Sequence, residues 1–242
     1  MIGNIAASRK FAFRLFVVVV LLTVAGAAVQ VIKHYRITFP LVGTFLEVFD
    51  LDGEGNIPAW SNSVLLALAG VILGIIAMNR KAVRARYAGH WLALAVLFIL
   101  LSMDEIVALH ERLTHTISRH FTIGGFFRFL WVIPGMAFAA AVGLLYLPFL
   151  FHLPRWTRNW IILSTVMYLG GALGVEMCSG YARVTFGLRS VHYWAAVVVE
   201  EFLEMSGLVA FIYALLGHAS RYLGNYVTPQ QPTPPLRTAR GR

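Results

Sequence analysis

The chain has 242 residues, of which 59% are hydrophobic and 13% are charged, and its mean hydropathy is +0.73. A soluble domain carries about 25% charged residues, so this composition excludes an ordinary globular enzyme, a disordered chain and a coiled coil. Because Cys178 is the single cysteine, a disulfide scaffold is excluded as well. The composition predicts an all-α, polytopic membrane protein whose first partner is the lipid bilayer.

Six stretches are apolar over the roughly 20 residues that a membrane-spanning helix needs. In chain order they are residues 11–32, 59–78, 90–109, 126–151, 160–177 and 191–216. They predict a six-transmembrane-helix bundle that forms a single domain over residues 1–224. Residues 225–242 contain four prolines and three arginines, and this composition predicts a flexible, basic cytoplasmic tail.

The first stretch has two interpretations. Arg9, Lys10 and Arg14 precede an apolar run that reaches Ala25-Gly26-Ala27, a pattern typical of a cleaved signal peptide. The apolar residues continue to Ile32, beyond the small-residue segment. This continuation favours a retained helix.

The distribution of Lys and Arg predicts that both termini lie in the cytoplasm. With the N-terminus inside, the inner segments hold 13 of these residues and the outer segments hold 7. The short loop 80–86 alone carries four of them, and short loops are where the positive-inside rule is strongest. The net charge of +9 follows from this bias and from attraction to anionic lipids, so no nucleic-acid partner is expected.

All eleven acidic residues fall in the predicted outer half of the protein, and the inner loops contain none. At 100° per residue, Asp104, Glu111 and His115 share one helical stripe. Glu200, Glu201 and Glu204 cover a second arc, with His192 near its edge. Ionisable residues within a membrane are costly and almost always face the bundle interior. We therefore expect an acid and histidine cluster that opens outward.

One hypothesis for this cluster is a divalent-metal site, because carboxylates and imidazoles from several helices bind Fe, Mn or Zn in helical bundles. A metal-bound water would then hydrolyse a lipid or membrane-associated substrate, with Glu105 or Glu201 as the general base. Neither Glu-x-x-His nor His-Glu-x-x-His occurs, so composition supports this hypothesis more than spacing does. The predicted metal ligands are Asp104, Glu111, His115, Glu176, His192, Glu200 and Glu204.

Three alternatives remain open for the same acids. They can form a structural network with the outer arginines Arg112, Arg183 and Arg189. The chain can be a non-catalytic accessory or scaffold subunit that has a membrane-protein complex as its partner. It can also be a cation- or proton-coupled transporter, since intramembrane glutamates are typical of proton relays.

A second cation site is suggested in the first outer loop. Asp50, Asp52, Glu54 and Asn56 alternate as in the first half of an EF-hand calcium loop. The twelfth position is Ser61, which cannot supply the bidentate carboxylate of such a loop. An Asp/Gly/Asn-rich turn before a helix is therefore favoured over a weak calcium site.

Two segments of the chain resemble a group of bacterial multi-pass membrane proteins that have no assigned activity. The first is FDLDGEGNIPAW at residues 49–60, and the second is LSMDEIVALHE at residues 101–111. The resemblance extends over most of the chain up to Leu216 and does not include the basic tail. It implies the bacterial inner membrane as the location, and it implies no particular reaction.

Overall fold

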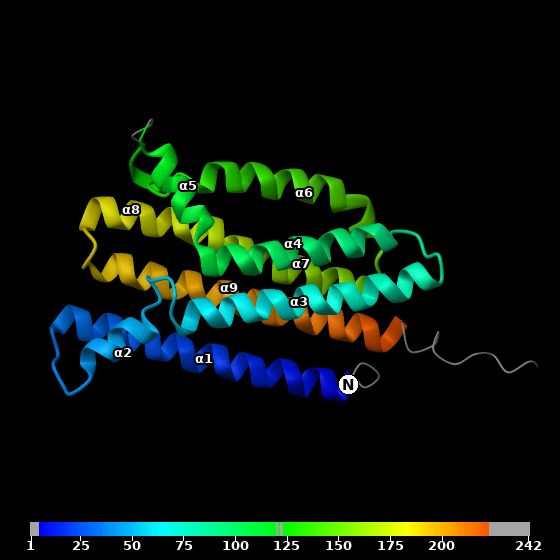
Figure 1. The fold of residues 1–242 in the computed structure, drawn as a ribbon, viewed down its shortest axis with the longest axis horizontal. Helices are drawn as coiled ribbons and strands as arrows, with labels where there is room; N and C mark the ends of the chain where they lie inside the picture. Colours follow the sequence, from blue (N-terminus) through cyan, green and yellow to red (C-terminus); the bar gives the residue numbers. More distant parts are fainter. Residues whose placement is uncertain (1–4, 120, 122, 223–242) are drawn as a thin grey trace, which may run out of the picture.

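The computed structural model describes residues 5–119, 121 and 123–222, and all regular structure within them is helical (Figure 1). The predicted tail, residues 225–242, lies outside this part. In chain order the elements are α1 (Ile5–Tyr35), α2 (Val42–Phe49), α3 (Ile57–Ala82), α4 (Ala88–Val107), α5 (Leu109–Ile117), the short turn η1 (Gly125–Phe127), α6 (Val132–His152), α7 (Arg155–Leu169), the π-helical turn η2 (Gly170–Val175), α8 (Glu176–Phe186) and α9 (Val191–Tyr222).

Helices occupy all six apolar stretches of the sequence and extend beyond most of the predicted limits. Five are long and apolar enough to cross a membrane, namely α1, α3, α4, α6 and the continuous rod that α7, η2 and α8 form together. The last stretch is occupied by α9, which has 32 residues. The helices α2 and α5 were not expected, because segments of 8 and 9 residues are too short to give a hydropathy signal of their own.

The central helix is α9, which packs against α1, α3, α7 and α8. Most of its residues from 204 to 219 are buried. Two glycines allow backbones to meet along the rod. A Cβ atom on Gly207 would lie 2.7 Å from the backbone nitrogen of Tyr168, and one on Gly171 would lie 2.8 Å from the carbonyl oxygen of Glu200. Small residues at such contacts let membrane helices pack closely, so α9 is fixed against both α7 and η2.

The turn before α3 is ordered by protein groups. The side chain of Asn56 accepts a hydrogen bond from the backbone nitrogen of Ala59 at 3.0 Å and so caps the helix, with Pro58 in the first turn. The Asn56 amide nitrogen donates to the carbonyl oxygen of Asp50 at 2.6 Å. The Asp50 carboxylate pairs with Lys33. These hydrogen bonds form an Asp/Gly/Asn-rich turn directly before a helix, the arrangement that the sequence favours for residues 50–56.

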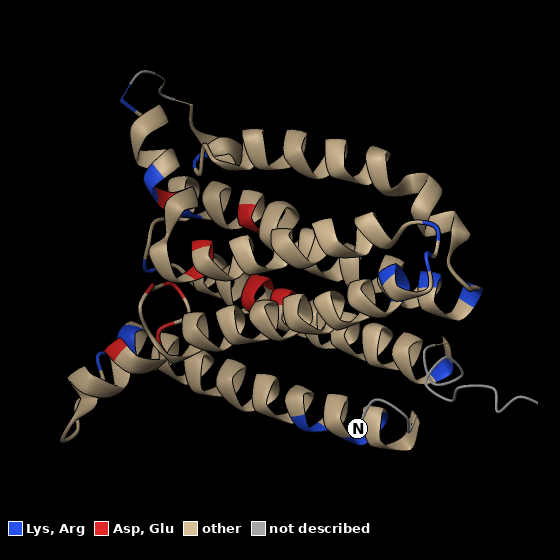
Figure 2. Ribbon diagram, turned by 45° about the vertical axis from the view of Figure 1, so that its right-hand side comes forward, with Lys and Arg blue, Asp and Glu red and all other residues tan. Residues whose placement is uncertain are grey.

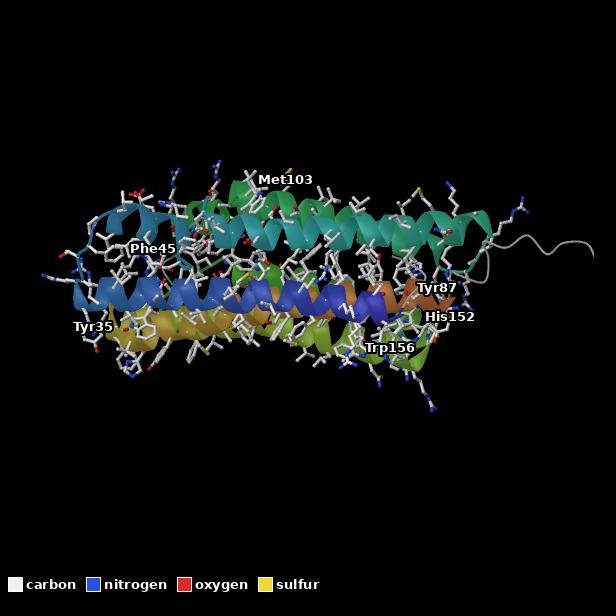
Figure 3. All side chains as sticks on the ribbon, turned by 90° about the horizontal axis from the view of Figure 1, so that it is seen from below. Tyr35, Phe45, Tyr87, Met103, His152 and Trp156 are labelled. Carbon is white, nitrogen blue, oxygen red and sulfur yellow. The ribbon has the colours of Figure 1, made fainter. Side chains whose placement is uncertain are left out.

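The two ends of the bundle differ in chemistry. Figure 2 shows the described acids confined to one half of the molecule, the half that contains α2 and α5. The opposite end carries Tyr87, His152 and Trp156 (Figure 3), and the rings of Tyr87 and His152 are 5.1 Å apart. Nearby, the buried His218 contacts Arg80 and Thr157 at 3.2 Å each. Among the described residues, the end opposite the acids therefore carries aromatic and basic groups.

Candidate functional site: an acid-lined cavity

A cavity of about 620 Å³ runs through the bundle between α4, α6, α7 and α9. Its size is typical of a site for a small molecule. One end is lined by nine acidic side chains, which are Asp52, Glu54, Asp104, Glu105, Glu111, Glu176, Glu200, Glu201 and Glu204. The remaining wall is largely apolar and aromatic, with contributions from Leu94, Phe98, Phe138, Tyr146 and Phe149. We refer to these two regions as the acidic end and the apolar wall.

The cavity brings together seven of the residues that the sequence nominates. These are Asp104, Glu105, Glu111, Glu176, Glu200, Glu201 and Glu204. The two nominated histidines are not among the lining residues. Both His115 and His192 are exposed, and the ring of His192 stacks on that of Phe186 with centroids 4.2 Å apart. The complete predicted set of metal ligands is therefore not assembled in one place.

A break in the helix explains why the predicted stripe does not persist. Helix α4 ends at Val107, and Ala108 adopts a left-handed conformation with φ of 53° before α5 begins. The stripe through Asp104 and His115 assumes one continuous helix, so the break removes His115 from it. Met103, beside Asp104, points outward from α4 (Figure 3) and is half exposed.

The same break creates a contact that sequence reasoning missed. Beyond Ala108 the chain returns toward the end of α4, and the backbone nitrogen of His110 donates to Asp104 Oδ1 at 3.2 Å. The imidazole Nδ1 of His110 lies 2.9 Å from Asp104 Oδ2. Its Nε2 lies 3.8 Å from Glu54 Oε1. The only sequence signal for His110 was its place in the second of the two motifs, LSMDEIVALHE.

The acids around His110 determine its charge. Burial acts to lower the pKa of His110, but the hydrogen bond and negative charge of Asp104, together with the charges of Glu176 and Glu54, raise the pKa to about 9. Burial and the neighbouring Glu105 raise the pKa of Glu54 to about 7. Burial also raises the pKa of Asp52, against a hydrogen bond from Tyr193. At neutral pH the acidic end therefore holds an imidazolium at His110 beside a Glu54 carboxyl group that is about half protonated.

Trp131 joins the elements at the acidic end. Its indole Nε1 donates to Glu176 Oε1 at 2.8 Å, and its ring centroid is 5.1 Å from that of His110. Its backbone nitrogen donates to Thr114 Oγ1 at 3.1 Å. The start of α6 is thus connected to both α5 and α8. Glu176 follows η2 directly, so the π-helical turn determines which way this acid faces.

Asn62 joins two acids from different helices. Its side chain is 0% exposed. The amide nitrogen donates to Glu105 Oε1 on α4 at 3.1 Å and to Glu204 Oε2 on α9 at 3.3 Å. Because a buried amide has two N–H groups to give, Asn62 uses both of them to hold α3, α4 and α9 together at the acidic end.

The acids are not neutralised one by one by arginines. Within the described residues, no acidic side chain lies within 4.0 Å of an arginine, and the ion pairs involve Lys33 and His110 instead. Arg183 is the one Lys or Arg among the described residues that line the cavity. The network with Arg112, Arg183 and Arg189 that the sequence allowed is therefore absent from this part of the chain.

The described residues contain no group of three or more His, Cys, Asp or Glu side chains arranged to hold a metal ion. The Fe, Mn or Zn site consequently stays a prediction from composition. In the first loop, Asp52 accepts a hydrogen bond from the Tyr193 hydroxyl at 2.5 Å, and Asp50 and Asn56 also have protein partners. The weaker calcium site at Asp50, Asp52, Glu54 and Asn56 likewise stays a prediction.

The fold and the cavity define a class, namely a helical bundle with helices long enough to cross a membrane and with an internal acid-lined cavity. Residues 14–219 match the family model described as "Domain of unknown function (DUF8692)", and the chain belongs to that family. No curated protein and no solved structure matches the chain. The family match supports the expectation of a family without an assigned activity.

Proposed function

We propose that this protein is an integral inner-membrane protein of bacteria that binds a membrane-borne amphiphile with a cationic head group. The observation that carries the proposal is the combination of the acidic end and the apolar wall within one cavity of about 620 Å³. The head group would lie among the carboxylates, and the hydrocarbon part would lie along α4 and α6.

Electrostatics supports a cationic ligand over an anionic one. Nine acidic side chains line the cavity, and Arg183 and His110 are the positively charged groups beside them. Burying uncompensated carboxylates costs free energy, and a bound cation reduces that cost. An anion of the same size would add to the repulsion.

The apolar wall supports a ligand that arrives from the bilayer. From Leu94 to Asp104 the helix α4 rises about 15 Å along the cavity, which provides a long apolar surface below the acidic end. In the proposed orientation, six spans with both termini in the cytoplasm place the acidic end toward the periplasm, in agreement with the positive-inside bias of the sequence.

Ligand binding in lipid nanodiscs tests the proposal. Dodecylammonium and dodecyl sulfate have the same tail and opposite charge, and calorimetry and Tm measure their binding. We expect the ammonium to bind and to raise the Tm, and we expect the sulfate to do neither. The double substitution Glu200→Gln/Glu201→Gln is expected to weaken ammonium binding by about tenfold or more, the cost of losing charge-assisted contacts.

The matched control is Glu47→Gln, since Glu47 lies on α2 outside the cavity. Equal binding of both amphiphiles, or an equal loss in the control variant, would contradict the proposal. Metal analysis of the same preparations examines the alternative from the sequence. A stoichiometric Fe, Mn or Zn ion that disappears in the double variant and that dodecylammonium does not displace would favour the metal-dependent enzyme instead.

A further inference from the structure

Few hydrogen-bond donors of the described residues reach the buried glutamates of the acidic end. Five of the acids that line it are glutamates of α4, α8 and α9, namely Glu105, Glu176, Glu200, Glu201 and Glu204. The donors that reach them from described side chains are the Asn62 amide, which bonds Glu105 and Glu204, the Trp131 indole, which bonds Glu176, and the Ser179 hydroxyl, which is within reach of Glu200. The hydroxyl of Ser179 also lines the cavity and lies beside the Glu200 carboxyl group, and its single hydrogen is shared with the carbonyl oxygen of Glu176 at 2.9 Å.

Among the described residues, two buried oxygens of the glutamate group and its Asn62 partner have no hydrogen-bond partner. One is Oε2 of Glu200, a residue that lines the cavity. The other is Oδ1 of Asn62, whose side chain is fully buried against Glu105 and Glu204. Buried polar atoms in folded proteins are nearly always hydrogen-bonded, so an orphaned acceptor indicates a missing donor. Both orphaned atoms here are oxygens, and both belong to the same group of side chains.

The backbone geometry keeps Glu200 in this position. A Cβ atom on Gly171 would lie 2.8 Å from the Glu200 carbonyl oxygen and 2.9 Å from Glu204 Cγ, so η2 and α9 are in direct contact here. The α9 backbone therefore has little room to rotate Glu200 toward another donor. Because Glu200 lines the cavity, a molecule bound there can supply donors to its carboxyl group.

We infer that the head group bound at the acidic end is a primary ammonium, which donates hydrogen bonds to the carboxyl groups of Glu200 and its neighbours. This inference rests on the proposed function and names the substrate class for the same cavity. An ammonium offers three N–H donors, which match a site rich in acceptors. A quaternary ammonium carries the same charge but has no N–H group, so it leaves the Glu200 oxygen unpaired.

A comparison of two cations tests the inference. Dodecylammonium and dodecyltrimethylammonium share a tail and a charge and differ in their N–H groups. We expect the primary ammonium to bind the protein in nanodiscs about tenfold more tightly or better, the loss typical of an unpaired buried group. The substitution Glu200→Gln replaces the orphaned oxygen by a group that can itself donate, so it is expected to reduce the preference for the primary ammonium. The Glu47→Gln variant is expected to retain it.

The outcomes separate the two proposals. Binding of neither cation would overturn the proposed function and the inference together. Equal binding of both cations would overturn the inference alone, as would an unchanged preference in Glu200→Gln. The Tm of each ligand-free variant identifies a folding defect, and Glu200→Asp, which retains the carboxyl group, provides a second variant if Glu200→Gln fails to fold.

Discussion

The contact between Asp104 and His110 places a cation at the centre of the acidic end. The imidazole lies 2.9 Å from Asp104 and 3.8 Å from Glu54, and Trp131 packs beside it. A carboxylate that holds one ring nitrogen orients the imidazole and favours its protonated form. His110 therefore organises the surrounding acids, and its protonation state should affect the stability of the whole end.

The stability of the protein should fall as the pH rises from about 5 to about 9. The pKa of His110 is raised from 6.5 to about 9, so its stabilising contribution is complete below 6.5 and is lost as the pH rises through about 9. The pKa of Glu54 is raised from 4.5 to about 7, so folding favours its protonated form, and stability is lost as the pH rises from 4.5 through about 7. Both changes have the same sign.

Thermal unfolding in nanodiscs across this pH range measures the effect. His110→Gln is expected to remove the part of the decline above pH 6.5, where His110 titrates. His115→Gln serves as the control, because His115 is exposed and lies outside the cavity. A decline above neutral pH that persists in His110→Gln would show that another group is responsible.

The sequence predicted the acids of the site better than the histidine. Glu200, Glu201 and Glu204 lie on one uninterrupted helix, so helical phase predicts that they share a face, and all three line the cavity. His110 is six residues after Asp104, and on a continuous helix the two would point about 120° apart. The left-handed residue between them, Ala108, is neither Gly nor Asn. Nothing in its residue type indicated that the helix would break there.

At the scale of elements, hydropathy located the long helices, because lipid-compatible segments must satisfy their backbone hydrogen bonds internally. It did not locate α2, α5 or the turn η2. Short helices depend on contacts from other segments for their stability. A π-helical turn also leaves the hydropathy of a segment unchanged. The small residues of Gly170–Val175 permit close packing, and Gly171 is in direct contact with α9.

The contact between α7 and α9 predicts a position that does not tolerate a methyl group. Gly207→Ala would place its Cβ 2.7 Å from the Tyr168 nitrogen and 3.0 Å from the Ser164 oxygen, both of which are backbone atoms that cannot move independently. Overpacking of this kind typically costs about 1–3 kcal/mol. Gly74→Ala is the matched control, because its Cβ would meet Ala95 at 4.0 Å, an ordinary contact.

Thermal or denaturant unfolding in detergent micelles compares the two variants. We expect Gly207→Ala to lower the Tm, and we expect Gly74→Ala to leave it unchanged or to raise it slightly, since Ala favours helices more than Gly does. Equal stability of the two variants would mean that α7 and α9 do not approach each other as closely as described.

At the scale of the whole molecule, charge is distributed along the bundle axis. All described acids lie in one half, and the opposite end carries basic and aromatic groups (Figures 2 and 3). Arg80 and the neighbouring Lys81 lie in the last turn of α3 there. This polarity agrees with a bundle whose basic end faces the cytoplasm. The sequence alone predicts this distribution of charge, because it follows from the number of charged residues in each loop and does not depend on how the helices pack.

Cysteine labelling in intact cells tests the orientation. In a Cys178→Ser background, Thr38→Cys lies between α1 and α2 near the acidic end, and Ala82→Cys lies at the end of α3 in the opposite half; both positions are exposed. A membrane-impermeant maleimide is expected to label the first without permeabilisation and the second only after it. The reverse pattern would invert the topology and would place the acidic end in the cytoplasm.

The π-helical turn η2 rotates α8 relative to α7, so the two parts of this continuous helix face different neighbours. Such a turn contains one residue more than α-helical winding would use, and each residue corresponds to a rotation of about 100°. Before the turn, Tyr168 of α7 packs against Gly207 of α9. After the turn, Glu176 of α8 faces Trp131. Deleting a single residue from Gly170–Val175 would restore regular winding and keep the rod nearly as long, yet it would swing Glu176 out of the cavity. For this segment, a change in residue number is therefore more damaging than a change in residue type.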